Sequence, residues 1–280
     1  MKKKLLGIVT AMLISSLTLV GCGSSNNSNS TSGSRKDVSI KISGSTSISP
    51  LMEKEAETYK SKNEGTNIEI QAVGSSSGIQ NAINGITEIG MSSRDLKSEE
   101  KSANLKEQTI AYDGIAVITN KNNKVKELTS AQIKDIYTGK IKNWKEVGGE
   151  DKTIVVVSRE DGSGTRDAFQ EILGFKSEEL IQDATIADGS GNIKTTVQNN
   201  DNAIGYVSFE QLDELITVQK VDGVEATPEK VKSKEYKLSR PFLLVYNEGK
   251  ISEQGKKFID FILSEEGQNI VDKNGSIKVD

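Results

Sequence analysis

The chain contains no histidine and only one cysteine among its 280 residues. Without histidine it cannot form the Ser–His or Cys–His pairs that activate most hydrolytic nucleophiles. The same shortage removes the His/Cys clusters that hold zinc, and no G-x-x-x-x-G-K-[S/T] phosphate loop is present. One cysteine allows no disulfide within the chain. The sequence therefore argues against an enzyme, and we expect neither a cofactor nor a metal. A Ser–Lys hydrolase is compatible with the composition, but no spacing of serine and lysine supports one.

An excess of positive charge is also lacking. Lysine and arginine number 36 against 40 acidic residues, which gives a net charge of −4. Nucleic-acid-binding domains carry a basic patch or stripe, whereas residues 230–237 mix both signs and are best explained as solvated surface. We expect no nucleic-acid partner. A bound anion would have to be held by local dipoles and one or two arginines.

The start of the chain has the pattern of an export signal. Three lysines at positions 2–4 precede an apolar segment, residues 5–20, that is too short for a convincing membrane span. The pattern is typical of a secretory signal peptide, and its end, L-V-G-C at Cys22, resembles a bacterial lipobox. We predict a signal peptide over residues 1–21 and lipidation of Cys22; the alternative is cleavage elsewhere with an incidental cysteine.

The segment after Cys22 is almost entirely serine, asparagine, glycine and threonine. Such a composition cannot bury a core, so residues 22–37 are predicted to be a lipidated cysteine followed by a flexible tether. The remaining residues, 38–280, are numerous enough for two α/β lobes.

One stretch, residues 153–173, carries the strongest functional signal. A β-branched run at 154–157 predicts a strand buried on both faces, and apolar residues at helical spacing near 169–173 predict a helix. The loop between them reads S-R-E-D-G-S-G-T over residues 158–165. Glycines allow close backbone approach, and a helix start offers free N–H groups that favour negative charge. The loop is suited to an oxyanion.

Individual side chains support that interpretation. Arg159 supplies a planar fork that matches a tetrahedral anion, and Asp161, two residues later, could orient the guanidinium. Ser163, Gly164 and Thr165 add hydroxyls and N–H groups at the helix start. The alternative is an ordinary glycine-rich turn capped by Ser163 or Thr165.

The same design of strand, Ser/Gly/Thr loop and helix occurs twice more. The loops are residues 44–49 and 74–78. In an open α/β sheet such loops lie at the carboxyl ends of strands, where ligands bind, so we expect three helix N-termini to converge on one small anion. A fourth glycine-rich segment, residues 188–192, is interpreted as a helix cap rather than a phosphate contact. Trp144 is expected to be a packing anchor rather than a ligand platform, and residues 258–270 one closing amphipathic helix.

Several motifs then appear in a specific order: L-V-G-C ending at Cys22, G-S-T at 44–46, G-S-S-S-G at 74–78, M-S-S-R at 91–94, I-Y-T-G-K-I-K-N-W at 136–144, R-E-D-G-S-G-T at 159–165 and A-I-G-Y-V at 203–207. The set resembles the phosphate-binding protein (PstS) family of ABC phosphate importers over essentially all of residues 38–280. The resemblance implies a type II periplasmic-binding-protein fold: two α/β lobes, each a mixed sheet flanked by helices, joined by two crossover strands. Lobe 1 would comprise residues 38–113 and 240–280, and lobe 2 residues 114–239.

The resemblance also implies a set of phosphate contacts, with Asp161 as the residue that braces Arg159. Many family members have a ligand aspartate where this chain has Ser93, and Asp95 lies two residues on. A carboxylate that accepts the phosphate proton would repel fully ionised sulfate; Asp95, or alternatively Asp113, is the expected acceptor. The expected contacts are Thr46, Ser47 through its N–H, Ser75, Ser93, Arg94, Asp95, Arg159, Ser163, Gly164 and Thr165.

By this resemblance the chain would be an extracytoplasmic, lipid-anchored, monomeric solute-binding protein. It would capture inorganic phosphate between its lobes and deliver it to the permease subunits of an ABC importer in a bacterial membrane. Three alternatives stay open: a binding protein for another tetrahedral oxyanion such as sulfate or molybdate, a secreted serine hydrolase or phosphatase, and a structural or adhesive protein that binds no small anion.

Overall fold

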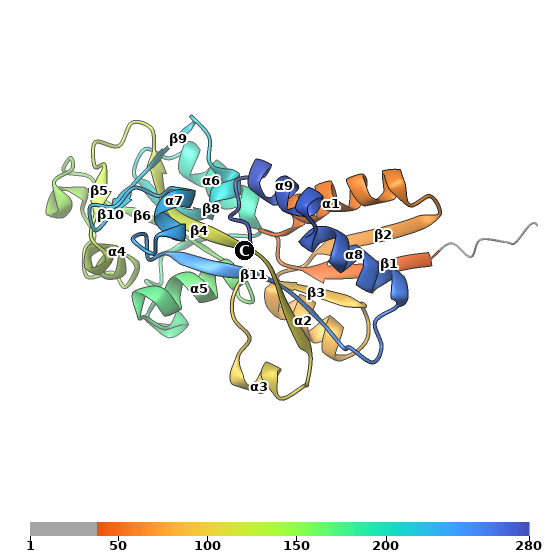
Figure 1. The fold of residues 1–280 in the computed structure, drawn as a ribbon. Coiled ribbons are helices and arrows are strands. Elements are labelled where there is room, and N and C mark those ends of the chain that lie inside the picture. The colour runs from red at the N-terminus through yellow and green to blue at the C-terminus, as the bar shows by residue number, and fades with distance from the viewer. Residues whose placement is uncertain (1–37, 280) are drawn as a thin grey trace, which may run out of the picture. The chain divides into compact units, whose positions relative to one another are not determined.

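The computed structural model describes residues 38–279 of the chain. The predicted signal peptide, Cys22 and the tether lie outside these residues. A nine-stranded sheet runs through the described part in the order β2-β1-β3-β11-β4-β8-β6-β7, with β9 paired to β4, and a two-stranded sheet joins β10 to β5 (Figure 1). Within residues 38–279 no helix has both the length and the apolar character needed to cross a membrane.

The strands are β1 Val38–Gly44, β2 Thr66–Ala72, β3 Ile89–Ser92, β4 Lys106–Asn120, β5 Glu127–Leu128, β6 Val155–Arg159, β7 Thr185–Ala187, β8 Ala203–Ser208, β9 Ile216–Val218, β10 Lys220–Val221 and β11 Ser239–Tyr246. The α-helices are α1 Ser49–Lys62, α2 Ser75–Ile83, α3 Ser98–Lys101, α4 Ser130–Tyr137, α5 Gly164–Leu173, α6 Ser190–Gln198, α7 Pro228–Lys232, α8 Glu253–Leu263 and α9 Glu265–Lys273. Three 3₁₀ turns add η1 Trp144–Val147, η2 Ser177–Glu179 and η3 Phe209–Gln211.

The side of the molecule that contains β1, β2 and β3 is called lobe 1. These strands are parallel, with Ile40 opposite Ile68 and Ile42 opposite Ile89. Helices α1, α8 and α9 pack their apolar residues on one face of this sheet, and α2 covers the other through Ile79. The apolar stripes of the helices are buried because each faces a β-branched strand surface.

The side that contains β6, β7, β8 and β9 is called lobe 2. Here β6 lies parallel to both β7 and β8. A separate hydrophobic cluster fills this lobe, and within it Phe169 of α5 stacks on Tyr206 of β8 with ring centroids 4.0 Å apart. Residues 115–238 supply all but one of the buried residues of this cluster, Ile277 being the exception. The predicted lobe boundaries are compatible with these clusters and stay a prediction.

Two long antiparallel strands, β4 and β11, pass between the lobes. The first part of β4 pairs with β11 and its last part with β8 and β9. At the crossing, Asp113 and Arg240 face each other as a buried pair, with Arg240 Nη2 2.8 Å from Asp113 Oδ2. The expected two-lobed α/β fold with two crossover strands is therefore confirmed.

One expected element differs in extent. The single closing helix over residues 258–270 is wrong: it divides at Ser264 into α8 and α9. Ser264 adopts an extended conformation, and its hydroxyl caps the new helix by accepting from the N–H of Gly267.

Candidate functional site

The structure brings the three predicted loops together at one place between the lobes. Ser47 in the loop after β1 meets Thr165 of α5, with Oγ and Oγ1 2.8 Å apart. Ser76 in the first turn of α2 donates its N–H to the carbonyl of Gly162 in the loop after β6, at 3.2 Å. The start of α5 and the loop before it thus contact the loop before α1 and the start of α2 across the two lobes.

The loop after β6 has the turn chemistry that its sequence suggests. Gly162 has a φ of 83°, a conformation that favours glycine. Ser163 is the N-cap of α5, and its hydroxyl accepts from the N–H of Arg166. Ser163 and Thr165 are both buried. Ser163 therefore caps α5 at the place where this loop contacts lobe 1.

Arg159, at the end of β6, is 2 % exposed and lies at the centre of the arrangement. Its Nη2 donates to Thr46 Oγ1 of lobe 1 at 2.9 Å, and its Nη1 donates to Ser190 Oγ of α6 at 3.2 Å. Ser190 Oγ in turn lies 2.9 Å from Thr46 Oγ1 and 3.0 Å from Ser47 Oγ. We call Thr46, Ser47, Thr165 and Ser190 the hydroxyl cluster.

The carboxylate that orients Arg159 is Glu160. Its two oxygens accept from Arg159 Nε and Nη2, both at 2.7 Å, and one of them also accepts from the N–H of Gly189. Burial alone would raise the pKa of Glu160, but the hydrogen bonds and charge of Arg159 hold that pKa below its ordinary value. Glu160 is therefore an anion that fixes the guanidinium in one orientation.

The prediction that Asp161 braces Arg159 is wrong. The Asp161 side chain is 92 % exposed and pairs with Arg166, whose Nη1 lies 2.7 Å from Oδ1. Asp161 stands in the turn itself, next to Gly162, so its side chain leaves toward solvent rather than back along β6. Arg166 contacts Arg159 only through the backbone, by donating to its carbonyl at 3.0 Å.

A second group of contacts adjoins the start of α2. Ser75 Oγ lies 3.3 Å from Ser93 Oγ and accepts from the N–H of Ser93 at 3.1 Å. Both serines are completely buried. Gly164 of α5 faces them closely, because a Cβ atom on Gly164 would stand 2.3 Å from Ser75 Oγ and 2.8 Å from Ser93 Oγ. These two serines therefore meet the start of α5 across the lobes.

The backbone of Ser47 is used differently from the expectation. Its N–H donates to Ser45 Oγ at 3.2 Å, within its own loop, while its hydroxyl joins the cluster. In this conformation the side chain of Ser47, rather than its N–H, faces the other lobe.

Arg94 and Asp95 are not brought to the hydroxyl cluster. Arg94 is buried and donates through Nε to Asp167, through Nη1 to Glu100 and the Asp95 carbonyl, and through Nη2 to Glu100 and Ser76. These bonds occupy all five N–H donors of the guanidinium, which leaves none for an anion. Asp95 is exposed and lines a separate crevice of about 500 Å³. Neither residue is positioned for its expected contact.

Asp113, the alternative proton acceptor, has both carboxylate oxygens hydrogen-bonded to protein groups. Its Oδ1 accepts from Ser208 Oγ and the N–H of Phe209, and its Oδ2 accepts twice from Arg240. Burial raises the pKa of Asp113, with Arg240 acting in the opposite direction. Arg240 also donates to the carbonyl of Ser93 at 3.3 Å. The Asp113–Arg240 pair therefore lies at the crossover and contacts the site through the Ser93 carbonyl.

Two residues of the site were missed in the sequence. Ser190 begins α6 after Gly189, whose φ is 78°. The sequence predicts a helix cap there, although D-G-S-G at residues 188–191 repeats the D-G-S-G of residues 161–164 and is a usable signal. Glu160 offered no signal to separate it from its neighbour Asp161. Both sit within reach of Arg159, as described above.

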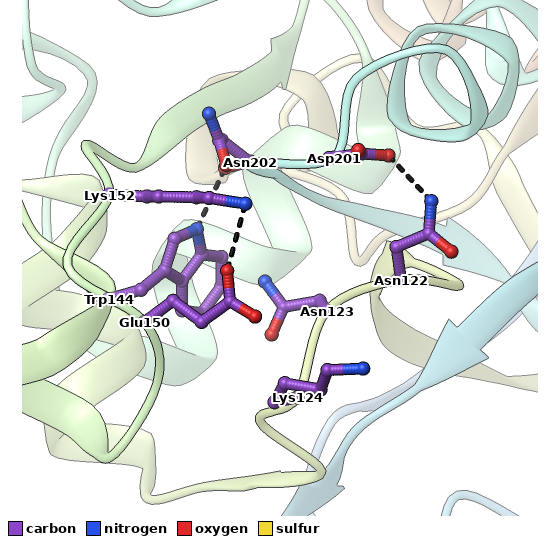
Figure 2. A pocket seen from close by; sticks show the side chains of 8 residues that line it. All are labelled: Asn122, Asn123, Lys124, Trp144, Glu150, Lys152, Asp201 and Asn202. Carbon is purple, nitrogen blue, oxygen red and sulfur yellow. Dashed lines mark hydrogen bonds and ion pairs between the residues drawn. The ribbon is translucent and has the colours of Figure 1, made fainter.

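Trp144 is a packing anchor, as expected. Its side chain is 2 % exposed in the core of lobe 2, and its Nε1 donates to the carbonyl of Asn202 at 2.9 Å (Figure 2). The hollow beside it, ringed by Glu150, Lys152 and Asp201 among others, holds only about 30 Å³. That volume suits a water molecule or two rather than a larger ligand.

The arrangement of buried hydroxyls, one guanidinium and converging helix starts is suited to binding a tetrahedral oxyanion. Within residues 38–279 the hydroxyls of the cluster form side-chain hydrogen bonds with one another and with Arg159. Residues 38–279 contain no group of three or more His, Cys, Asp or Glu side chains that could hold a metal ion.

Comparison with known proteins places the chain in a family. The PBP superfamily domain matches residues 25–266. The phosphate-binding protein PstS of Bacillus subtilis (strain 168) is 34% identical over 293 residues, covering 100% of this chain and 95% of that protein. Two solved structures have similar folds. A candidate phosphate ABC transporter substrate-binding protein from Clostridium perfringens, with bound phosphate, is 66% identical with a TM-score of 0.86; the match covers 86% of this chain and 100% of that one.

The second structure, an ABC-type phosphate transport receptor from Vibrio cholerae, is 35% identical with a TM-score of 0.75, and covers 86% of this chain and 100% of its own. The residues matched by the family model, 25–266, include the loops that meet at Arg159. The chain belongs to the PBP superfamily and, within it, to the PstS family of phosphate-binding proteins.

Proposed function

We propose that this chain captures inorganic phosphate between its two lobes and delivers it to an ABC importer. The observation that carries the proposal is the buried guanidinium of Arg159, which reaches hydroxyls of both lobes while Glu160 holds it in place. Such a group can bind two oxygens of a tetrahedral anion at once.

The electrostatics of the site suit a small anion in a protein of net negative charge. The starts of α1, α2 and α5 each present a partial positive charge toward the same place. Micromolar capture requires about −8 kcal/mol. A handful of hydrogen bonds to a charged ligand, each contributing roughly 1.5–3 kcal/mol, can supply this after the entropic cost of binding.

The proposed contacts come from both lobes. Arg159 and the residues that follow it in the start of α5 supply the lobe 2 side, and the loops after β1, β2 and β3 supply the lobe 1 side. Because only the closed arrangement brings these donors together, phosphate would shift the protein toward closure. The contacts are Thr46, Ser47, Ser75, Ser93, Arg159, Ser163, Gly164 and Thr165.

The proposal extends to how the protein is placed in the cell. The signal-like start and Cys22 support a lipid-anchored, extracytoplasmic protein. As part of the same proposal, the protein acts as a monomer and docks on permease subunits. The predicted tether would give the folded part reach from the membrane surface.

Calorimetric titration tests the function directly. The chain is titrated with phosphate, with sulfate and with molybdate, alongside Arg159→Met and the control Lys142→Met, an exposed lysine of the same lobe. We expect saturable phosphate binding that sulfate competes with weakly, lost in Arg159→Met and kept in Lys142→Met. Preference for sulfate or molybdate would assign another oxyanion, and Arg159-dependent turnover of a chromogenic phosphate ester would assign a hydrolase.

A further inference from the structure

The start of α6 contributes a side chain that the three-loop arrangement does not account for. Ser190 is 6 % exposed, although it stands at the first residue of its helix. Its hydroxyl does not cap α6, whose N-cap is Gly189 and which has no side-chain cap. Instead it faces Arg159, Thr46 and Ser47, all of them on other elements. A serine buried in this way serves the cluster rather than its own helix.

The hydrogen bonds of the cluster can be counted. Thr46, Ser190, Ser47 and Thr165 form a chain of four hydroxyls joined by three contacts of 2.9, 3.0 and 2.8 Å. Each hydroxyl has one proton to donate and can also accept, so one proton remains beyond the three links. Arg159 donates into this chain at Thr46 and Ser190. The four linked hydroxyls can therefore donate a hydrogen bond to an anion while all of them stay neutral.

Ser190 holds the most connected position in that chain. It contacts two hydroxyls of lobe 1 and receives a hydrogen bond from Nη1 of Arg159, the residue on which phosphate capture depends. An oxygen that accepts from Nη1 of Arg159 would thereby come next to Ser190 Oγ. The N–H of Gly189, one residue before, is fixed by Glu160 at 3.2 Å, so the start of α6 is tied to the same carboxylate that orients Arg159.

We propose that Ser190 is a contact residue for the captured phosphate, which makes the start of α6 a fourth helix start at the site, after those of α1, α2 and α5. This inference rests on the proposed function and assigns one more donor to it. Ser190 donates its hydroxyl to a phosphate oxygen next to the one bound by Nη1 of Arg159, in exchange for its contacts with Thr46 and Ser47.

The test is phosphate calorimetry on the whole chain, solubilised in mild detergent, with Ser190→Ala and Ser190→Gly. Loss of one hydrogen bond to a charged ligand predicts a dissociation constant that is roughly ten- to hundredfold larger. Ser130→Ala is the matched control, because Ser130 also begins a helix of lobe 2 but pairs with Asp222; it is expected to bind phosphate as the wild type does. Urea unfolding without phosphate checks that each variant folds.

A crystal structure of the chain with phosphate supplies the second measurement. We expect a phosphate oxygen within about 3.2 Å of Ser190 Oγ. The inference is overturned if the wild type binds phosphate and both folded variants bind it with the same affinity. It is also overturned if the bound phosphate leaves Ser190 bonded only to protein hydroxyls. Either result leaves the proposed function standing. Absence of phosphate binding in the wild type overturns the proposed function instead.

Discussion

Arg94 of lobe 1 and Asp167 of lobe 2 form an ion pair, with Nε and Oδ2 2.9 Å apart. Lys97 adds a second contact to the same carboxylate at 3.2 Å. Glu100 holds the other side of the Arg94 guanidinium; burial alone would raise the pKa of Glu100, but the hydrogen bonds from Arg94 and the N–H of Lys97 keep it below its ordinary value. The pair therefore joins the lobes by charge at a place outside the hydroxyl cluster.

Removing the negative charge of Asp167 is expected to weaken phosphate binding, although Asp167 is not one of the proposed phosphate contacts. Asp167→Asn keeps the shape of the side chain but removes the attraction that favours closure. We expect a loss of about 1 to 2 kcal/mol, or roughly five- to thirtyfold in affinity, with the preference for phosphate over sulfate unchanged. Asp135→Asn, in a surface pair with Lys140, is the control. Equal affinities in calorimetry would show that the pair does not help to close the lobes.

The two neighbouring acids after Arg159 offer a matched comparison. Glu160→Ala frees the guanidinium that Glu160 holds by two hydrogen bonds of 2.7 Å, so phosphate affinity should fall about tenfold or more as Arg159 loses its fixed orientation. Asp161→Ala removes only an exposed partner of Arg166 and should change affinity by less than about twofold. The reverse order in phosphate titrations would restore Asp161 as the orienting residue.

The convergence of loops could be predicted because it follows from local pattern and sheet geometry. Each loop lies between a β-branched run and an amphipathic helix, and parallel strands bring such loops to one edge. The choice between Glu160 and Asp161 could not be predicted, since it depends on the direction in which the turn at Gly162 sends each side chain. The lobes and crossovers were expected from family resemblance, whereas the break at Ser264 depends on one residue's backbone conformation.

Arg94 shows why a motif alone does not define a site. The sequence places it beside Ser93, where a guanidinium next to hydroxyls is a reasonable anion ligand. Its partners are Glu100, six residues on, and Asp167, in another lobe. Long-range pairing of this kind is invisible in a single sequence, and it decides whether an arginine has a donor to spare.

Gly164 should prove essential to closure. A methyl group there would meet Ser75 Oγ at 2.3 Å and Ser93 Oγ at 2.8 Å, both across the interlobe contact. Gly164→Ala should therefore weaken phosphate binding by roughly fivefold or more, since overpacking typically costs about 1–3 kcal/mol. Urea unfolding of the phosphate-free variant should change little, because open lobes avoid the clash. Gly249→Ala, with only Asn247 Oδ1 nearby at 3.5 Å, is the control; a Gly164→Ala variant of full affinity contradicts the prediction.

Glu55 in α1 should make stability depend on pH. It is completely buried, and neither carboxylate oxygen has a hydrogen-bond partner among the described residues. Burial, with a smaller effect of the charge on Glu266, raises its pKa from 4.5 to about 8. Between these values the folded chain binds a proton that the unfolded chain has released, so the free energy of unfolding falls as pH rises through this window.

Glu55→Gln keeps the shape and removes the ionisation. At pH 4, below both pKa values, the variant should match the wild type, because Glu55 is then largely protonated in the folded and in the unfolded chain. At pH 8.5 the variant should be more stable by up to a few kcal/mol, because each pKa unit corresponds to about 1.4 kcal/mol. Glu57→Gln, exposed on the same helix, controls for the general effect of the substitution. Urea unfolding at the two pH values measures the difference, and a variant with the same pH dependence as the wild type would mean that Glu55 stays ionised in the fold.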